Sequence, residues 1–408
     1  MTDNLESRGR DGFPARLFMI YILFYAGQAM YNTYLNLFLN SKGFSMTAIG
    51  TLGSVSTILL VLIQPLWGVL SDKSKSKNNI VGFLLIVVAI VGIGFYASDV
   101  GLWLAACVML YSIFFTPAMS LQDNYALESL EESKWDFGHV RLGGTVGYAA
   151  CAGLVGFIIK ENYGQIFWMM SLFFLVTGIL YFSMPRVSGH RQKNQKVRYS
   201  VLFKDRPLVC MFFFNVLYSL GTQFYFQFYP LHYHNVLGAS SQMVGLLSTF
   251  SAISEIPFFW YAFRIERRFG PKNVMLFAGI ATTLRWFLLY FVTDQYLVLA
   301  VNLLSGCGYV GFMYCLIKYI NDNVPRSMRA TAQSLNGILG TIFSRIIFAP
   351  VGGILADHFG AANILLIAGF LMGIGCLGFG ILFPMAVRYQ KAHPLAASGG
   401  DGNPEIVE

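Results

Sequence analysis

The chain has 408 residues, of which 56% are hydrophobic, 16% aromatic and only 12% charged. Soluble globular proteins carry about 25% charged residues, so this composition excludes a soluble globular fold. The formal net charge is +8, from 28 Lys and Arg against 20 Asp and Glu. These values predict an all-α protein that crosses a membrane several times.

Apolar runs of about 20 residues, the length that spans a ~30 Å hydrocarbon core as helix, recur along the chain. Twelve are expected, at 15–38, 46–70, 79–97, 101–123, 139–160, 164–184, 207–230, 242–263, 273–292, 295–319, 330–356 and 362–386. They are long and continuous rather than short and alternating, which excludes a transmembrane barrel. The predicted order is an N-terminus (1–14), a six-helix bundle (15–184), a basic linker (185–206), a second six-helix bundle (207–386) and a tail (387–408).

Basic residues orient these spans, because cytoplasmic loops carry an excess of Lys and Arg. One set of loops holds nearly all of them, whereas the opposite loops offer only Lys42 and Lys160. Both termini, the linker and the tail are therefore predicted to be cytoplasmic, in a multi-pass protein of the plasma (cell inner) membrane. The positive charge is explained by topology and contact with membrane lipid, so no nucleic acid partner is expected.

Six cysteines all fall within predicted spans, without a CxxC pair or a histidine cluster beside them. They are interpreted as small packing residues, so neither a disulfide framework nor a metal site is predicted. No cofactor is expected, and a monomer is the predicted state. No nucleophile–base pair or phosphate loop appears in the spans, which argues against an enzyme.

The two bundles look related in sequence. The segment that begins YLNLFLNSKGF at Tyr34 resembles the one that begins FYPLHYHNVLG at Phe228, and Gly50 and Gly245 occupy the same place in the two copies. Such duplication is typical of transporters in which the substrate site lies at the bilayer midplane between two halves. The glycine-rich stretches in both copies suit close helix packing and sliding.

Five charged residues lie inside predicted spans: Asp123, Arg141, Glu255, Arg285 and Arg345. A charge at the bilayer centre costs about 2.5–3.5 kcal/mol or more, so such residues usually face a wet cavity, pair with one another, or bind a substrate or proton. These five are the first candidates for a functional site.

The loop Gly68-Val-Leu-Ser-Asp72-Lys73, between the second and third spans, resembles the signature loop of the major facilitator superfamily. RIERRFGPKN, from Arg264, resembles a degenerate copy in the second half. The resemblance implies two pseudo-symmetric six-helix bundles, and a gating role for Gly68, Asp72 and Lys73. A merely solvated basic loop is the alternative.

A narrower resemblance is to the branch that contains lactose permease and the nucleoside–proton symporters. Asp123 and Arg141 have the spacing of a carboxylate–arginine pair that engages sugar there, and Tyr148 stands where a stacking aromatic does. Glu255 matches a glutamate that binds substrate hydroxyls, and Arg285 an arginine near the proton site. The resemblance implies that Asp123, Arg141, Tyr148 and Glu255 bind substrate. For Asp123 and Arg141, near the cytoplasmic ends of their spans, an interfacial ion pair without substrate contact is the alternative.

The chain departs from lactose permease where proton chemistry is expected, because the span-ten histidine and glutamate fall on Ser305 and Gly308. If a proton is coupled, Glu255 or Asp123 must carry it, with Arg285 nearby. Without such coupling the protein is a uniporter. Arg285 and Arg345 could also snorkel, or pair with Glu255 as structural glue.

Polar and aromatic residues in the first span of each half, Tyr31, Asn32, Gln223 and Gln227, are expected to line the cavity. Anchoring at the membrane interface is the alternative for the aromatic ones. The predicted function is transport of a small polyhydroxylated solute, a sugar or oligosaccharide before a nucleoside or an aromatic carboxylate, with proton symport. Three arginines against two carboxylates favour an anionic substrate if all lie in the cavity. A receptor that binds solute without moving it is the alternative from another class.

Overall fold

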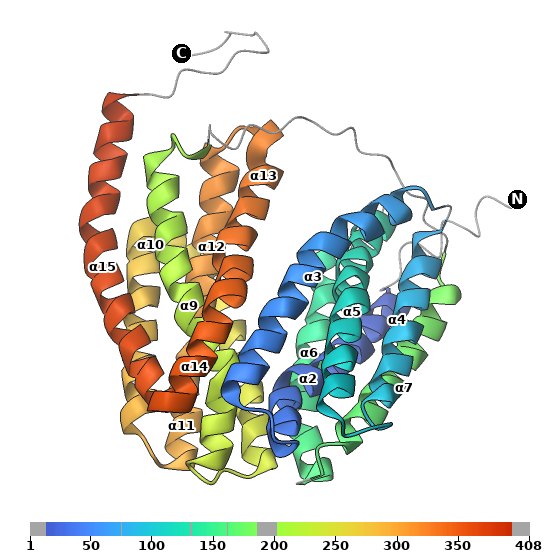
Figure 1. Ribbon diagram of the computed structural model, residues 1–408. Helices are drawn as coiled ribbons and strands as arrows, with labels where there is room; N and C mark the ends of the chain where they lie inside the picture. Colours follow the sequence, from blue (N-terminus) through green and yellow to red (C-terminus); the bar gives the residue numbers. More distant parts are fainter. Residues whose placement is uncertain (1–13, 75, 131–132, 161, 186–201, 394–408) are drawn as a thin grey trace, which may run out of the picture.

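The structure, a computed structural model, describes residues 14–74, 76–130, 133–160, 162–185 and 202–393. One group of helices, here called the N half, comprises α2 (Ala15–Ser41), α3 (Met46–Asp72), α4 (Lys77–Gly94), α5 (Gly101–Ser129), α6 (Phe137–Ile159) and α7 (Gln165–Phe182). The C half comprises α9 (Arg206–Asn235), α10 (Ser241–Phe291), α11 (Gln295–Asn302), α12 (Ser305–Asn323), α13 (Arg326–Gly337), η2 (Ile338–Ile342), η3 (Ser344–Phe348), α14 (Ala349–Phe359) and α15 (Ala361–Ala392). Figure 1 shows the two groups side by side.

Twelve spans are present in the described part of the chain. Ten segments are long and apolar enough to cross a membrane. One of them, the 51-residue α10, contains two helices, because Gly270 has φ 75° and ψ 159° and turns the chain sharply. Pro271 then begins the second helix, at the position where a missing N–H costs nothing. The more polar α2, of 27 residues, is the twelfth. The basic stretch from Arg264, expected as a loop, is helical on both sides of Gly270.

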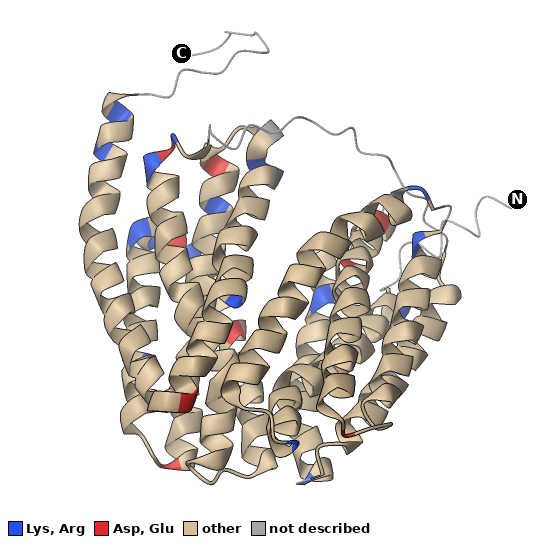
Figure 2. Ribbon diagram, in the orientation of Figure 1, with Lys and Arg blue, Asp and Glu red and all other residues tan. Residues whose placement is uncertain are grey.

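Lys and Arg gather at one end of the helices, here called the basic end, which lies at the top of Figures 1 and 2. It includes the end of α3 with Lys73, the starts of α4 and α9, and the end of α15 with Lys391. The other end is called the opposite end and holds Lys42 and Lys160. The prediction that both termini are cytoplasmic rests on this distribution of Lys and Arg. Most of the predicted linker (residues 186–201) lies outside the described residues.

Hydrogen bonds between the two halves all lie towards the opposite end, among the described residues. Asn235 donates to Asn40 (2.8 Å), Thr33 to Ser248 (3.2 Å), and the Ser54 hydroxyl to the Ile346 carbonyl (2.6 Å). At the basic end, ion pairs such as Lys77–Glu128 and Lys318–Glu266 (3.7 Å) stay within one half. The described chain is therefore closed at the opposite end and unlinked at the basic end.

Two helix crossings make this closure, α3 against α14 and α6 against α10. At the first, a Cβ on Gly50 would lie 2.3 Å from the Ala349 carbonyl oxygen; at the second, a Cβ on Gly245 would lie 2.2 Å from that of Ala152. One helical turn further along, Gly353 meets Met46 and Gly156 meets Ser241 in the same way. The repeat seen in the sequence thus places four glycines at equivalent points, where no side chain fits.

The helix starts at these crossings are also equivalent. Ser45 caps α3 by accepting from the Ala48 amide (3.1 Å), and Ser240 caps α10 by accepting from that of Met243 (3.4 Å). Serine is a preferred N-cap because its hydroxyl satisfies an amide that has no helical partner. The start of α3 has an additional partner in the C half. Asp357 on α14 accepts from the amides of Met46 (3.0 Å) and Thr47 (2.8 Å).

Candidate substrate cavity

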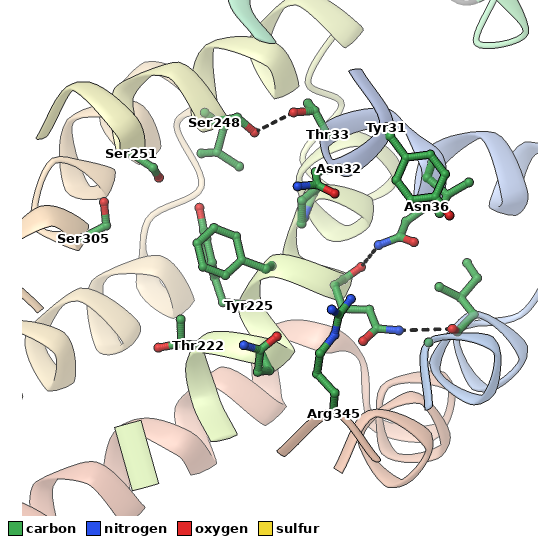
Figure 3. Close-up of a pocket in the computed structure, with 18 of the residues that line it drawn as sticks. Tyr31, Asn32, Thr33, Asn36, Thr222, Tyr225, Ser248, Ser251, Ser305 and Arg345 are labelled. Atoms are coloured by element: carbon green, nitrogen blue, oxygen red, sulfur yellow. Dashed lines mark hydrogen bonds between the residues drawn. The ribbon is translucent and has the colours of Figure 1, made fainter. Parts of the chain in front are cut away.

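A cavity of about 440 Å³ lies between the two halves and is lined by both. This volume falls within the usual range for small-molecule sites, about 300–1,000 Å³. Its described lining is rich in uncharged hydrogen-bonding side chains, which include Tyr31, Asn32, Thr33, Asn36, Ser112, Tyr148, Thr222, Gln223, Tyr225, Gln227, Ser248, Ser251, Ser305 and Tyr309. Figure 3 shows several of them pointing towards a common space.

Three charged side chains line the cavity, Glu255, Arg285 and Arg345, and all three belong to the C half. Glu255 lies near the middle of the first helix of α10, and Arg285 lies in the second. Arg345 lies in η3, one of two consecutive π-helical turns of the eleventh span. Such turns widen a helix locally and are frequent at functional sites. The sequence predicted these three charges, and the structure brings them to one cavity.

Arg285 is almost fully buried, at 4% exposure, and is held by uncharged partners. It donates to the Asn302 side-chain oxygen, which also accepts from the Tyr225 hydroxyl (2.8 Å). Its guanidinium lies over the Tyr225 ring, 4.1 Å from the centroid. Asn302 in turn donates to the Leu247 carbonyl (2.7 Å). This network fixes the arginine without neutralising it.

Glu255 is half-buried, and it has neither a hydrogen bond nor an ion pair within 4.0 Å among the described residues. Arg141 of the N half makes no ion pair with it within 4.0 Å. Its carboxyl group is therefore available for a solute hydroxyl or a proton.

The N half contributes a neutral wall. Tyr31 stacks on Tyr111, with 3.6 Å between ring centroids, and Asn32 and Tyr148 line the cavity beside it. Gln223, from the C half, also lines the cavity. Gln227 does too, but its side chain donates to the Ile49 carbonyl (3.1 Å) and so links the two halves.

Asp123 and Arg141, the predicted sugar-binding pair, are not among the residues that line this cavity. Asp123 accepts a hydrogen bond from the Tyr21 hydroxyl (2.7 Å), and the Arg141 guanidinium lies over the Tyr25 ring, 4.0 Å from its centroid. No ion pair within 4.0 Å joins them in the described chain. Both lie near the basic ends of their helices, Asp123 in α5 and Arg141 in α6.

The predicted gating loop has few described contacts. Gly68 lies within α3 and would accept a Cβ without meeting a neighbour, and Lys73 is the exposed residue that ends α3. The side chain of Asp72 lies outside the described part. The gating role of this loop stays a prediction.

Asn302, Thr33 and Asn36 are not among the functional residues predicted from the sequence. Asn302 is fully buried and connects Arg285, Tyr225 and α10. The available signal was a lone amide within the apolar run YLVLAVN, because a polar group inside a span tends to face other helices.

Comparison with known proteins places the chain among membrane transporters. The model of the MFS_1 like family matches residues 15–367. The maltose permease of Geobacillus stearothermophilus is 24% identical over 384 residues, covering 93% of this chain and 95% of that protein. The xanthosine permease of Escherichia coli is 24% identical over 368 residues, covering 79% of this chain and 82% of that protein.

Solved structures resemble this one in fold. A mutant of the nucleoside transporter NupG has a TM-score of 0.81 at 18% identity, covering 90% of this chain and 99% of that one. At this identity the likeness establishes the fold and not the substrate. The predicted all-helical fold of two bundles is confirmed.

Proposed function

Because the chain belongs to the MFS_1 like family of the major facilitator superfamily, whose members are secondary transporters rather than enzymes, we propose that it moves a small polyhydroxylated solute. A sugar or oligosaccharide is the favoured solute. The observation that carries this proposal is the central cavity, which combines many uncharged hydrogen-bonding groups with one unpartnered carboxylate. Hydroxyl-rich solutes need many such donors and acceptors, because each buried hydroxyl left unpaired costs free energy.

The two halves provide the movement. They are joined at the opposite end and unlinked at the basic end among the described residues. Rocking of the two halves about the cavity would open the opposite end and close the basic end. The glycine crossings suit this movement. They join the two halves through close backbone contacts, without interlocking side chains, so the contacts of one crossing can break together. With the basic end in the cytoplasm of a bacterial cell, the described state opens inward. One monomer contains the whole cavity.

Proton symport is assigned to Glu255. It is the one carboxylate among the described lining residues, and it lacks a partner there. Binding a solute hydroxyl would change the free energy of its charged form, and this couples solute to proton. Arg285 lies in the same cavity. Asp123 is held by Tyr21 outside the lining, so it is the second candidate carrier.

A nucleoside is the second candidate solute. Aromatic side chains line both walls, Tyr148 on one and Tyr225 and Tyr309 on the other, and an aromatic face suits a nucleobase as well as a sugar ring. Gln223 adds an amide that can pair with a base edge.

The test is uptake into liposomes that contain the purified protein, under an imposed proton gradient. Labelled maltose, sucrose, uridine and xanthosine are compared, with and without a protonophore. Accumulation of a sugar that the protonophore abolishes is the expected result. Equilibration that ignores the gradient would mean uniport, and binding without any uptake would support the receptor alternative instead.

A further inference from the structure

The charges that line the cavity do not balance. Its described lining holds two guanidinium groups and one carboxylate, and no ion pair within 4.0 Å joins Glu255 to either arginine. Asp123 lies outside the lining, so it does not neutralise the excess locally. With Glu255 ionised the lining carries one surplus positive charge, and with Glu255 protonated it carries two.

The two arginines differ in what they offer to a solute. Arg285 is buried and oriented by Asn302 and Tyr225, and its Nε has no hydrogen-bond partner among the described residues. Arg345 is exposed to the cavity and makes no hydrogen bond or ion pair with a described residue. In Figure 3 its side chain extends from the eleventh span towards the labelled lining residues. Arg345 is therefore the more accessible of the two.

A neutral sugar would leave this excess uncompensated at the depth of the bilayer, where a charge is costly. An arginine guanidinium can bind a carboxylate through two parallel charge-assisted hydrogen bonds, which are about twice as strong as neutral ones. The surrounding hydroxyl and amide groups would meanwhile bind the rest of an oxygen-rich molecule.

We propose that the transported solute carries an acidic group, in the class of a sugar acid or another small organic carboxylate, and that Arg345 binds it. This inference rests on the proposed transport function and narrows its substrate class. Glu255 would then bind hydroxyls or the coupled proton, and Arg285 would add positive potential from the wall. Recognition of the acid and recognition of hydroxyls are thereby assigned to different side chains.

The experiment compares acids with neutral molecules of the same shape. Binding to the purified protein is measured by thermal shift at constant ionic strength, for galacturonate against galactose, glucuronate against glucose, and 3-phenylpropionate against 3-phenylpropanol. Inorganic phosphate and chloride are included. The variants are Arg345→Gln, Arg345→Lys and the control Arg388→Gln, which changes an exposed arginine at the basic end of α15.

We expect at least one acid to bind about tenfold more tightly than its neutral partner, the difference that one charge-assisted contact of about 1.4 kcal/mol provides. Arg345→Gln should bring that pair within about twofold, Arg345→Lys should retain part of the preference, and Arg388→Gln should retain all of it.

The inference is overturned if no acid binds better than its neutral partner, if the preference survives Arg345→Gln, or if phosphate or chloride binds as tightly as the organic acids. Uptake of a neutral sugar without any acid preference would overturn this inference alone. Failure of every compound to enter liposomes would instead contradict the proposed transport function.

Discussion

At the two crossings between the halves, the N half and the C half use the same local geometry. Gly50 meets Ala349 and Gly245 meets Ala152 at nearly equal distances, 2.3 and 2.2 Å from a would-be Cβ to the carbonyl oxygen. In the cavity the halves differ, because the three charged side chains of the described lining come from the C half. We infer that the symmetric features serve the conformational exchange, and that the asymmetric ones serve recognition of the solute.

The largest effect is expected from removing the charge of Glu255 in the C half. Glu255→Gln keeps the size of the side chain but loses charge-assisted hydrogen bonds, each worth about 1.5–3 kcal/mol. Solute affinity should fall by about 10–100-fold in equilibrium binding. The matched control is Glu266→Gln on the same helix, whose carboxylate faces Lys318 outside the cavity lining. Near-normal affinity in Glu255→Gln would remove that residue from the site.

A bulky side chain at either crossing should weaken the closure of the opposite end, which the two crossings form. Gly50→Val and Gly245→Val both force a side chain against a backbone carbonyl, a strain of about 1–3 kcal/mol. Crosslinking between cysteines introduced at Asn40 and Asn235, which are hydrogen-bonded at the opposite end, should fall by about fivefold or more. The two variants should behave alike. A strong effect from one and none from the other would contradict the equivalence of the crossings.

Arg285→Lys tests whether solute binding depends on the shape of the Arg285 guanidinium or only on its positive charge. Lysine keeps the positive charge but loses the planar fork that reaches Asn302 and the face that lies on Tyr225. Solute affinity should fall by about tenfold, and the thermal midpoint should fall as well, because Asn302 loses a buried partner. Unchanged affinity would mean that only the charge of Arg285 matters.

Asp357 distinguishes the two crossings chemically. It accepts from the first amides of α3, whereas the equivalent position at the other crossing, counted along the helix from Ala152, is Lys160. A carboxylate at a helix N-terminus contributes about 0.3–1 kcal/mol. Asp357→Asn should therefore reduce crosslinking between cysteines introduced at Asn40 and Asn235 by only about twofold to fivefold. An effect as large as that of Gly50→Val would make this contact the main closure.

The smallest effect is expected from Asp123→Asn in the N half. Its carboxylate is held by Tyr21 outside the cavity lining, and asparagine can keep accepting that hydrogen bond. Solute affinity should change by less than about twofold. A loss comparable to that of Glu255→Gln would place Asp123 in contact with the solute and remove the asymmetry between the halves.

The sequence predicted the fold well because length and apolarity determine a membrane helix almost directly. All twelve spans were predicted on that basis, including the two that form α10. What was not predicted is that the stretch between those two is helical and that Gly270 turns the chain without a loop. The intramembrane charges made five residues candidates, because an ionised group in a span usually faces a wet cavity or a partner. Glu255, Arg285 and Arg345 line the cavity, whereas Asp123 and Arg141 do not.

Sequence reasoning could not predict which half would carry the cavity charges. The sequence spacing of Asp123 and Arg141 does not determine how far along their helices they lie relative to the cavity. Both lie closer to the basic end than the cavity does. The role of Asn302 depends on four partners that lie at least 17 residues away in the sequence, so no local pattern reveals it. The inter-half bond of Gln227 likewise needs the packed structure.

Alternating access about this cavity is tested most directly by the reactivity of a cysteine placed in its wall. Gln223→Cys, with the six native cysteines replaced by alanine, is exposed in membranes to an impermeant thiol reagent from each side in turn. The proposed transporter predicts labelling from both sides, slowed by solute. Labelling from one side only, whatever the solute or proton gradient, would contradict alternating access and favour a receptor that binds without transport.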